Sequence, residues 1–310
     1  MKSLAYLFAA GLLAWAFGAQ AASQDHGSAD TGHAKSAAVD QKGGGHGASA
    51  DKGASADKHA KPTGGHAKKA TGGDAKKGGA PHWSYAGRIG PEEWGKLSRD
   101  FRACAAGAMQ SPIDLGGRGS LAATGEAIAF DYRVTPLSIV NNGHTVQVNY
   151  APGSSITVGG KRYELLQFHF HAPSEHGVGS RPAAMEVHFV HKSADGELAV
   201  VGVLIDGGQE NLALREVWAA MPKRAGPERT SNQVVVNGRD LLPDDTSYYR
   251  YMGSLTTPPC TEGVNWYMLK GRIEVGVAQV ERFAAAVGGP NARPTQALNH
   301  RLVVAPRAAN

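Results

Sequence analysis

The sequence predicts a predominantly β fold: a single domain built on a large, mostly antiparallel twisted central sheet, with a few peripheral short helices. Short runs rich in β-branched and aromatic residues recur from about residue 128 onward, separated by Gly, Pro, Asn and Asp. Helical periodicity is confined to two short segments. Residues 81–310 can bury one large core, and an all-β domain of this length can be a single unit.

Eight runs are predicted as strands, because each combines β-forming residues with turn residues at its ends. In order they are 128–132, 137–140, 144–150, 155–158, 163–171, 184–191, 198–205 and 265–269. Asn142-Gly143 predicts a tight turn before the third run. Helices are expected over 212–218 and 277–286, the second ending before Pro290.

The first residues read as a secretion signal. Lys2 gives a positive start, an apolar stretch follows over 4–16, and Ala19-Gln20-Ala21 fits a small-x-small cleavage site. We therefore expect a signal peptide over 1–21 and a periplasmic or secreted protein with no transmembrane anchor after cleavage. A retained N-terminal anchor is the alternative, although the stretch is short for a span.

Residues 22–80 consist mainly of Gly, Ala, Lys, Asp, Ser and His, without an aromatic side chain, so the sequence predicts a disordered low-complexity segment. Residues 81–310 form the expected folded domain. The segment 22–80 holds nine Lys and six acids, whereas 81–310 carries 22 basic and 21 acidic residues. The basic pI is thus mostly a property of the segment, and no nucleic-acid partner is predicted. Histidines in this segment leave open loose capture of Zn²⁺ or a plain soluble spacer.

The two cysteines, Cys104 and Cys260, are far apart in sequence. In an exported protein an even pair is most simply a disulfide, with two buried free thiols as the alternative.

The run from Gln167 to His176 contains the most informative pattern. If it is a strand, His169 and His171 project from one face and the phenylalanines between and before them from the other. His188 lies in the next predicted strand, 184–191, and can meet the other two histidines there. His191 lies on the opposite face of the same strand and points away. Three neutral imidazoles with one open position are typical of a catalytic zinc site, although copper or iron would also accept them.

Two of the histidines have a polar residue two positions before them, and this residue can orient the imidazole ring. Glu186 shares a strand face with His188, and Gln167 shares one with His169. A carboxylate or amide oxygen there can accept the second N–H of a metal-bound imidazole and fix its tautomer. One alternative reads His169-x-His171-x3-Glu175 as the first metal motif of a cupin-like barrel, in which Glu175 is itself a ligand.

Longer motifs favour a different family. Gly253–Trp266 carries the run GSLTTPPCTEGVNW, and Gln110-Ser111-Pro112-Ile113 and Asn141-Asn142-Gly143-His144 precede the histidine strands. Together these motifs, in this order, resemble the alpha-class carbonic anhydrases of the exported bacterial type. The resemblance runs from about Trp83 to the C-terminus, and Cys104 and Cys260 match the cysteine pair of the bacterial members.

The resemblance implies a zinc enzyme that hydrates CO2 reversibly to bicarbonate and a proton through zinc-bound hydroxide. It implies His169, His171 and His188 as zinc ligands and Glu175 as a hydrogen-bond partner of Thr256 rather than as a ligand. His144 aligns with the proton-shuttle histidine. CO2 and bicarbonate are the expected small-molecule partners, and a homodimer is left open.

The resemblance also implies the remaining site residues. The substrate pocket would be lined by Val190, Val200, Leu255, Thr257, Val264 and Trp266, and the proton-carrying waters would be ordered by Tyr85, Asn142 and Gln147. Gln147 departs from the asparagine common in animal members, which puts the water geometry in doubt. An inactive binding module related to the family is the remaining alternative.

Overall fold

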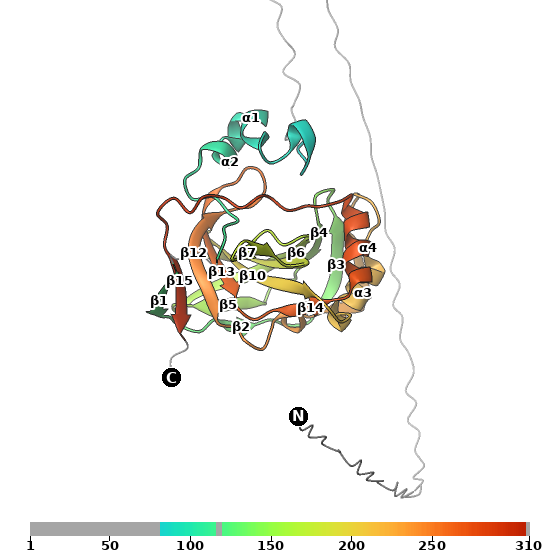
Figure 1. Ribbon diagram of the computed structural model, residues 1–310. Coiled ribbons are helices and arrows are strands. Elements are labelled where there is room, and N and C mark those ends of the chain that lie inside the picture. The colour runs from blue at the N-terminus through green and yellow to red at the C-terminus, as the bar shows by residue number, and fades with distance from the viewer. Residues whose placement is uncertain (1–80, 116–119, 308–310) are drawn as a thin grey trace, which may run out of the picture. The chain divides into compact units, whose positions relative to one another are not determined.

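The computed structural model describes residues 81–115 and 120–307, and a mixed, twisted sheet dominates them (Figure 1). The predicted signal peptide 1–21 and the segment 22–80 lie outside the described residues. The sheet has 13 strands, and the few helices lie around it. The predicted fold class is confirmed.

The elements follow one another in a strand-rich order. The strands are β1 (Ser120–Thr124), β2 (Ala129–Asp131), β3 (Thr135–Asn141), β4 (Val146–Asn149), β5 (Ser155–Val158), β6 (Lys161–His171), β7 (Gly177–Val178), β8 (Arg181–Pro182), β9 (Met185–Ser193), β10 (Leu198–Gly207), β11 (Arg229–Val236), β12 (Tyr248–Ser254), β13 (Glu262–Leu269), β14 (Ile273–Val275) and β15 (Val303–Arg307). The α-helices are α1 (Trp94–Leu97), α2 (Ala103–Ala106), α3 (Leu212–Ala220) and α4 (Val277–Val287), and the 3-10 turns are η1 (Gly87–Ile89), η2 (Arg99–Phe101) and η3 (Gly238–Leu241).

The long strands at the middle of the sheet carry the chemistry. The main path runs β1-β15-β12-β13-β10-β9-β6-β4-β3-β11, and β6, β9 and β10 pair antiparallel. Three pairings are parallel, namely β1 with β15, β10 with β13 and β10 with β14. The sheet is therefore mostly antiparallel, as predicted, with parallel contacts where distant segments meet.

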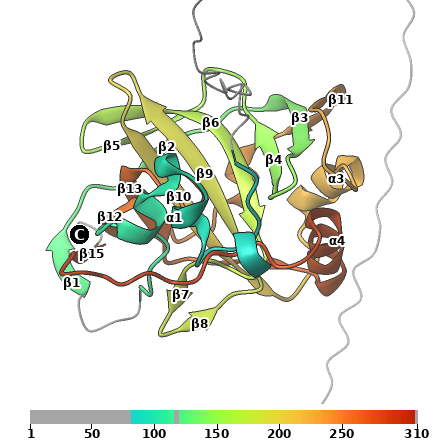
Figure 2. The same ribbon diagram turned by 90° about the horizontal axis from the view of Figure 1, so that it is seen from above.

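Helices α3 and α4 lie beside β3 and β4 (Figure 2). They were both predicted, and each begins and ends at a capping residue. Asn211 caps α3 by accepting from the Leu214 N–H at 3.2 Å, and α4 ends at Gly288, whose φ of 86° is left-handed. Among the described residues, no helix is long and apolar enough to cross a membrane.

Side chains of the central strands point alternately to the two faces of the sheet and so form two separate apolar clusters. Phe168 and Phe170 enter the larger cluster, where the Phe170 ring lies 4.8 Å from that of Trp218 on α3. The opposite side of β9 and β10 contributes Val200 and Val190 to a second cluster around Trp266. Because strand side chains alternate, a core on the phenylalanine side leaves the histidine side of β6 for a different use.

A third, smaller cluster surrounds the cysteine pair. Cys104 on α2 and Cys260 form a disulfide, as predicted, and they pack against Trp94 and Phe101. The bond joins the N-terminal turns to the segment after β12, 156 residues away in sequence. It thereby tethers the segment that carries Thr256.

Several strands were not predicted. β11 is an edge strand with mostly exposed side chains, so it lacks an alternating apolar pattern. β12 has the sequence YYRYMGS, in which aromatic residues stand on both faces. His144 was expected at the start of a strand but lies in the turn before β4, because Asn142 caps that turn by accepting from the His144 and Thr145 N–H groups.

Candidate metal centre and cavity

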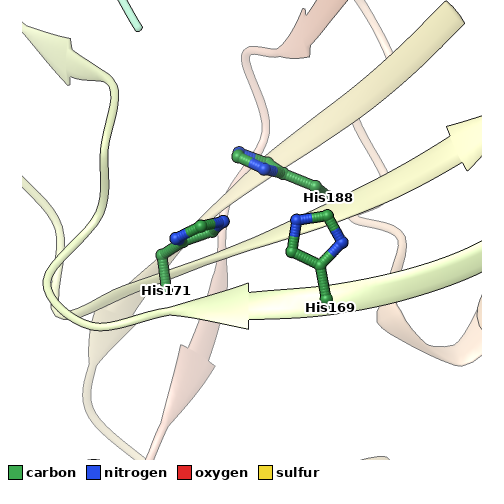
Figure 3. A group of neighbouring side chains, drawn as sticks. All are labelled: His169, His171 and His188. Atoms are coloured by element: carbon green, nitrogen blue, oxygen red, sulfur yellow. The ribbon is translucent and has the colours of Figure 1, made fainter. Parts of the chain in front are cut away.

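Three histidines from two paired strands converge on one point (Figure 3). His169 and His171 come from β6 and His188 from β9, and His169 lies directly opposite His188 in the ladder. One nitrogen from each imidazole lies within 4.8 Å of the other two. The ring centroids are 4.6–5.2 Å apart. This spacing is that of side chains gathered around one small ion.

A β-bulge sets this register. Leu165 pairs with His191 but Gln167 pairs with Val190, so Leu166 is an extra residue on β6, with its side chain 41% exposed. Without it the pairing would shift by one residue, and Phe168 rather than His169 would face His188.

Each of the three imidazoles has its other nitrogen fixed by an oxygen. The three pairs are His169 Nδ1 with Gln167 Oε1 at 2.8 Å, His171 Nδ1 with the Asn291 carbonyl at 2.8 Å, and His188 Nε2 with Glu186 Oε1 at 2.6 Å. Each of those oxygens accepts, so the imidazole nitrogen must donate its N–H. The opposite nitrogens then carry lone pairs aimed at the common point.

Burial keeps these rings neutral. It lowers the pKa of His169 well below the usual 6.5, and burial also lowers the pKa of His171 and of His188. His171 Nε2 is buried and has no hydrogen-bond partner among the described residues. Three neutral imidazoles, one with an orphaned acceptor nitrogen, fit a zinc ion.

Glu186 is the centre of a buried hydrogen-bond network behind His188. Its Oε2 accepts from the backbone N–H groups of Glu175 and His176, each at 2.8 Å. Its Oε1 also contacts His176 Nδ1 at 2.7 Å, and His176 Nε2 lies 2.7 Å from the Tyr251 hydroxyl. Although burial alone would raise it, the pKa of Glu186 is held well below its usual value by His176 and His188. Glu186 is therefore a fixed carboxylate that locks the His188 ring.

Glu175 lies beside the cluster but is not part of it. Its Oε1 accepts from the Arg293 backbone N–H at 2.9 Å, and its Oε2, 4.0 Å from His188 Nδ1, has no hydrogen-bond partner in the described part of the chain. Burial raises the pKa of Glu175 to about 7, and the nearby Thr256 hydroxyl acts in the opposite direction. The cupin-like alternative required this carboxylate as a ligand, but Glu175 belongs to neither group of gathered ligand atoms among the described residues: these are the three histidines, and the set His176, Glu186 and His188.

Thr256 is a buried residue in the loop after β12, and backbone hydrogen bonds hold this loop on both sides of it. The Leu255 N–H donates to the Thr261 carbonyl at 2.9 Å, and the Cys260 N–H donates to the Thr257 carbonyl at 2.8 Å. The disulfide holds Cys260 from the other side. These contacts fix the Thr256 side chain at the wall of the cavity that contains the histidines.

The cavity has a volume of about 240 Å³ and opens from the histidines toward the surface. Most predicted pocket residues line it: Val190, Val200, Leu255, Thr257 and Trp266. Val264 does not; it is 1% exposed and packs in the second core cluster behind Trp266. Apolar side chains thus form one wall beside the histidines.

Polar residues occupy the other wall and the rim. Tyr85, Asn142, Gln147 and His144 all line the cavity. Gln147 lies opposite His169 in the β4–β6 ladder and donates through Nε2 to Asn149 at 2.6 Å. Because the Asn142 oxygen accepts from the turn backbone, only its amide N–H₂ remains for solvent.

His144 is half-buried at the rim and stacks on Trp83, with ring centroids 3.6 Å apart and planes 6° from parallel. The centroid of the His82 ring lies 6.4 Å from that of His144. Burial and the nearby His82 lower the pKa of His144 from its usual 6.5.

Sequence reasoning missed four residues that build the site. Asn291 holds His171 through its carbonyl and accepts from the Ala172 N–H with its side chain. Arg293, His176 and Trp83 support Glu175, Glu186 and His144 in turn. His176 ends the histidine run and could have been noticed there; Asn291 and Arg293 lie over 110 residues away, without a local signal.

Comparison with known proteins gives this constellation a family. The family model described as eukaryotic-type carbonic anhydrase matches residues 89–307. The chain belongs to this carbonic anhydrase family. A carbonic anhydrase from Neisseria gonorrhoeae is 43% identical over 231 residues, which cover 74% of this chain and 90% of that protein.

Solved carbonic anhydrases also share the fold. The alpha-carbonic anhydrase of Thermovibrio ammonificans, in complex with sulfanilamide, superposes with a TM-score of 0.71 at 43% identity, covering 73% of this chain and all of that one. Dioscorin, solved in complex with ascorbate, superposes with a TM-score of 0.68 at 32% identity and covers 74% of this chain and all of its own. As a carbonic anhydrase, this chain catalyses the reversible hydration of CO2 to bicarbonate and a proton.

Proposed function

We propose that this carbonic anhydrase works with one Zn²⁺ held by His169, His171 and His188. The observation that carries the proposal is that each imidazole donates one N–H to a fixed acceptor and turns its other nitrogen toward the same point. Bound there, zinc supplies a Lewis acid that makes water nucleophilic at neutral pH. Gln167, Asn291 and Glu186 hold the rings in the required tautomers.

Thr256 and Glu175 determine whether a ligand that approaches the three histidines must carry a proton. The Glu175 carboxylate is an acceptor, with its Oε2 left for the Thr256 hydroxyl. When Thr256 donates there, its oxygen is left as an acceptor for a group that brings a proton. The pair therefore orients the reacting oxygen and disfavours anions that carry no proton.

The apolar wall suits CO2. Val190, Val200 and Trp266 offer no hydrogen bond, and CO2 is a small apolar molecule that needs none. Bicarbonate, being charged, is poorly held against such a wall and leaves to water.

The proton leaves through the polar side. We assign His144 as the group that carries it to solvent, because an imidazole near neutral pKa can accept and release a proton in turn. Asn142, Gln147 and Tyr85 lie along the same wall and offer hydrogen-bonding groups to the intervening waters.

We also propose where the protein is located. The disulfide suits an oxidising compartment, and the N-terminal pattern suits export with cleavage near residue 21. Mass determination of the N-terminus of the protein recovered from the periplasm would test both points, and an uncleaved N-terminus would contradict them.

The central test combines a metal measurement with an activity measurement. Wild type should bind one zinc per chain and hydrate CO2, whereas His188→Ala should lose most of both. The exposed His300 is the matched control, because His300→Asn keeps a residue that tolerates its φ of 65° and lies outside the cavity.

The outcomes separate the alternatives. A zinc-loaded wild type without hydratase activity would contradict the proposal and favour an inactive binding module. Retention of zinc by His188→Ala, with loss in Glu175→Gln, would favour the cupin-like ligand set instead.

A further inference from the structure

A basic groove lies between the end of α3, the middle of α4 and the start of β11. Four cationic residues line it, and we use the name basic groove for the site they form: Lys223, Arg224, Arg229 and Arg282. Its volume is about 610 Å³, and none of the described residues that line it is acidic. All four cations are exposed. Since 81–310 is nearly neutral overall, this is a local concentration of charge.

These cations differ from the basic residues that form ion pairs elsewhere on the described surface. Lys161, Arg215 and Arg272 each pair with a carboxylate within 3.0 Å. In the part of the chain that the structure describes, the four groove residues have no side-chain hydrogen bond, ion pair or ring contact. Like charges gathered without a counter-charge repel one another, and an anion bound among them would relieve that repulsion.

The groove is joined to the turn that carries His144. The Gly226 N–H donates to the Asn141 carbonyl at 3.0 Å, and the Asn141 side chain donates to the Pro222 carbonyl at 3.2 Å. A Cβ placed on Gly143 would lie 3.5 Å from the Ala225 Cβ. The loop between α3 and β11 and the turn that carries His144 are thus packed together at the rim of the cavity.

We propose that the basic groove binds a small divalent oxyanion, with hydrogen phosphate as the representative. The bound anion would accept the proton that His144 releases at the rim of the cavity. This rests on the proposed function, in which each turnover delivers a proton to His144. The groove raises the local concentration of an acceptor that would otherwise have to arrive from bulk solvent.

The step balances as a simple proton transfer. The N–H of the His144 imidazolium gives its proton to an oxygen of HPO4²⁻, which leaves neutral imidazole and H2PO4⁻. No electron moves and no other bond breaks. The product carries one negative charge fewer, so its attraction to the groove is weaker and it exchanges for a fresh dianion.

Binding is tested first, with zinc-loaded full-length protein and inorganic phosphate followed by ³¹P NMR titration. Lys223→Gln/Arg224→Gln removes two groove charges. Arg162→Gln/Lys192→Gln is the matched control, because both residues are exposed and form no ion pair among the described residues. Arg162 lies near the start of β6 and Lys192 near the end of β9. All variants keep the basic segment 22–80, so its contribution cancels.

The groove variant should weaken phosphate binding about fivefold, as expected for two exposed charges, while the control matches wild type. Binding by wild type should also weaken as salt is added. Equal binding by the two variants would overturn the proposal. Retention on anionic phospholipid vesicles without saturable binding of free phosphate would overturn it too, because that result would indicate a lipid-binding surface.

Kinetics then links binding to proton exit. CO2 hydration is followed against the concentration of phosphate and, separately, of a dimethylimidazole buffer whose basic form is uncharged. The ratio of half-saturating phosphate to half-saturating dimethylimidazole should rise about fivefold in the groove variant and not in the control. An unchanged ratio with normal hydration would overturn the inference alone, whereas absence of hydration in every buffer would overturn the proposed function.

Discussion

The inner end of the cavity and its rim are built differently. At the inner end, His171 and His188 are buried, and each donates to an acceptor that other contacts hold in place. At the rim, His144 is half-buried and its ring stacks on Trp83, with no hydrogen bond to the ring among the described residues. The contrast shows that hydrogen bonds orient the metal-binding histidines at the inner end. His144, which carries the proton, is instead free to exchange it with solvent.

The largest effect should come from the buried carboxylate behind His188. Glu186→Ala leaves four N–H donors without an acceptor, so we expect about 3–5 kcal/mol less stability and 10- to 100-fold weaker zinc binding. Urea unfolding and competition with a zinc chelator measure the two.

Glu274→Ala is the matched control, because this exposed carboxylate also accepts from a backbone N–H, that of Gln209. It should cost about 1 kcal/mol or less. Equal losses in the two variants would remove the distinction between a buried network and a surface contact. Should Glu186→Ala fail to fold, Glu186→Gln keeps the shape and one acceptor oxygen and should still weaken zinc binding.

Two neighbouring threonines test the orienting role next. Thr256→Ala should lower kcat/KM on the order of 100-fold, because a group aimed at the reacting oxygen is lost. Thr257→Ala, on the same loop and also lining the cavity, should change it far less. Comparable losses would assign the effect to the loop as a whole rather than to the Thr256 hydroxyl.

The rim should be easier to replace. His144→Ala should lower kcat on the order of tenfold, less than is usual for a positioned base, because water and buffer still accept the proton. An added imidazole buffer should restore much of the loss. The ring must be neutral to accept a proton, and its pKa is lowered, so kcat of wild type should stay high to a pH below 6.5. Failure of buffer rescue would argue against proton transfer as the role of His144.

A buried histidine away from the cavity should control stability instead of activity. Burial lowers the pKa of His191 to about 3, and its Nε2 lies 2.8 Å from the Tyr132 hydroxyl. The unfolded chain therefore takes up a proton near pH 6.5 that the folded chain refuses, and stability falls as the pH falls from there. The slope is at most about 1.4 kcal/mol per pH unit. His191→Gln should flatten it in urea unfolding; an unchanged slope would point to other groups.

The smallest effect should come from His82. Burial, and after it the nearby His82, lower the pKa of His144, so His82→Ala should move the midpoint of the kcat profile to slightly higher pH. Added salt should shrink the shift. A downward shift would contradict this electrostatic account.

The histidine face of β6 was readable from sequence because the strand period is two, so His169 and His171 had to project together, away from Phe168 and Phe170. The two longer helices were readable for a similar local reason, whereas the cysteine pair was readable because an exported chain with two cysteines most simply forms one disulfide. Unpredicted β11, in contrast, has no apolar alternation to reveal it, because an edge strand with exposed side chains needs none.

The sequence by itself determined which residue types were available: three imidazoles, their candidate acceptors and an apolar wall. Tertiary structure decided how they meet. The bulge at Leu166 brings His169 opposite His188, the Asn291 carbonyl fixes His171 from 120 residues away, and Val264 turns into the core rather than the cavity. Register and long-range contacts depend on the packing of the whole sheet, so no local pattern could encode them.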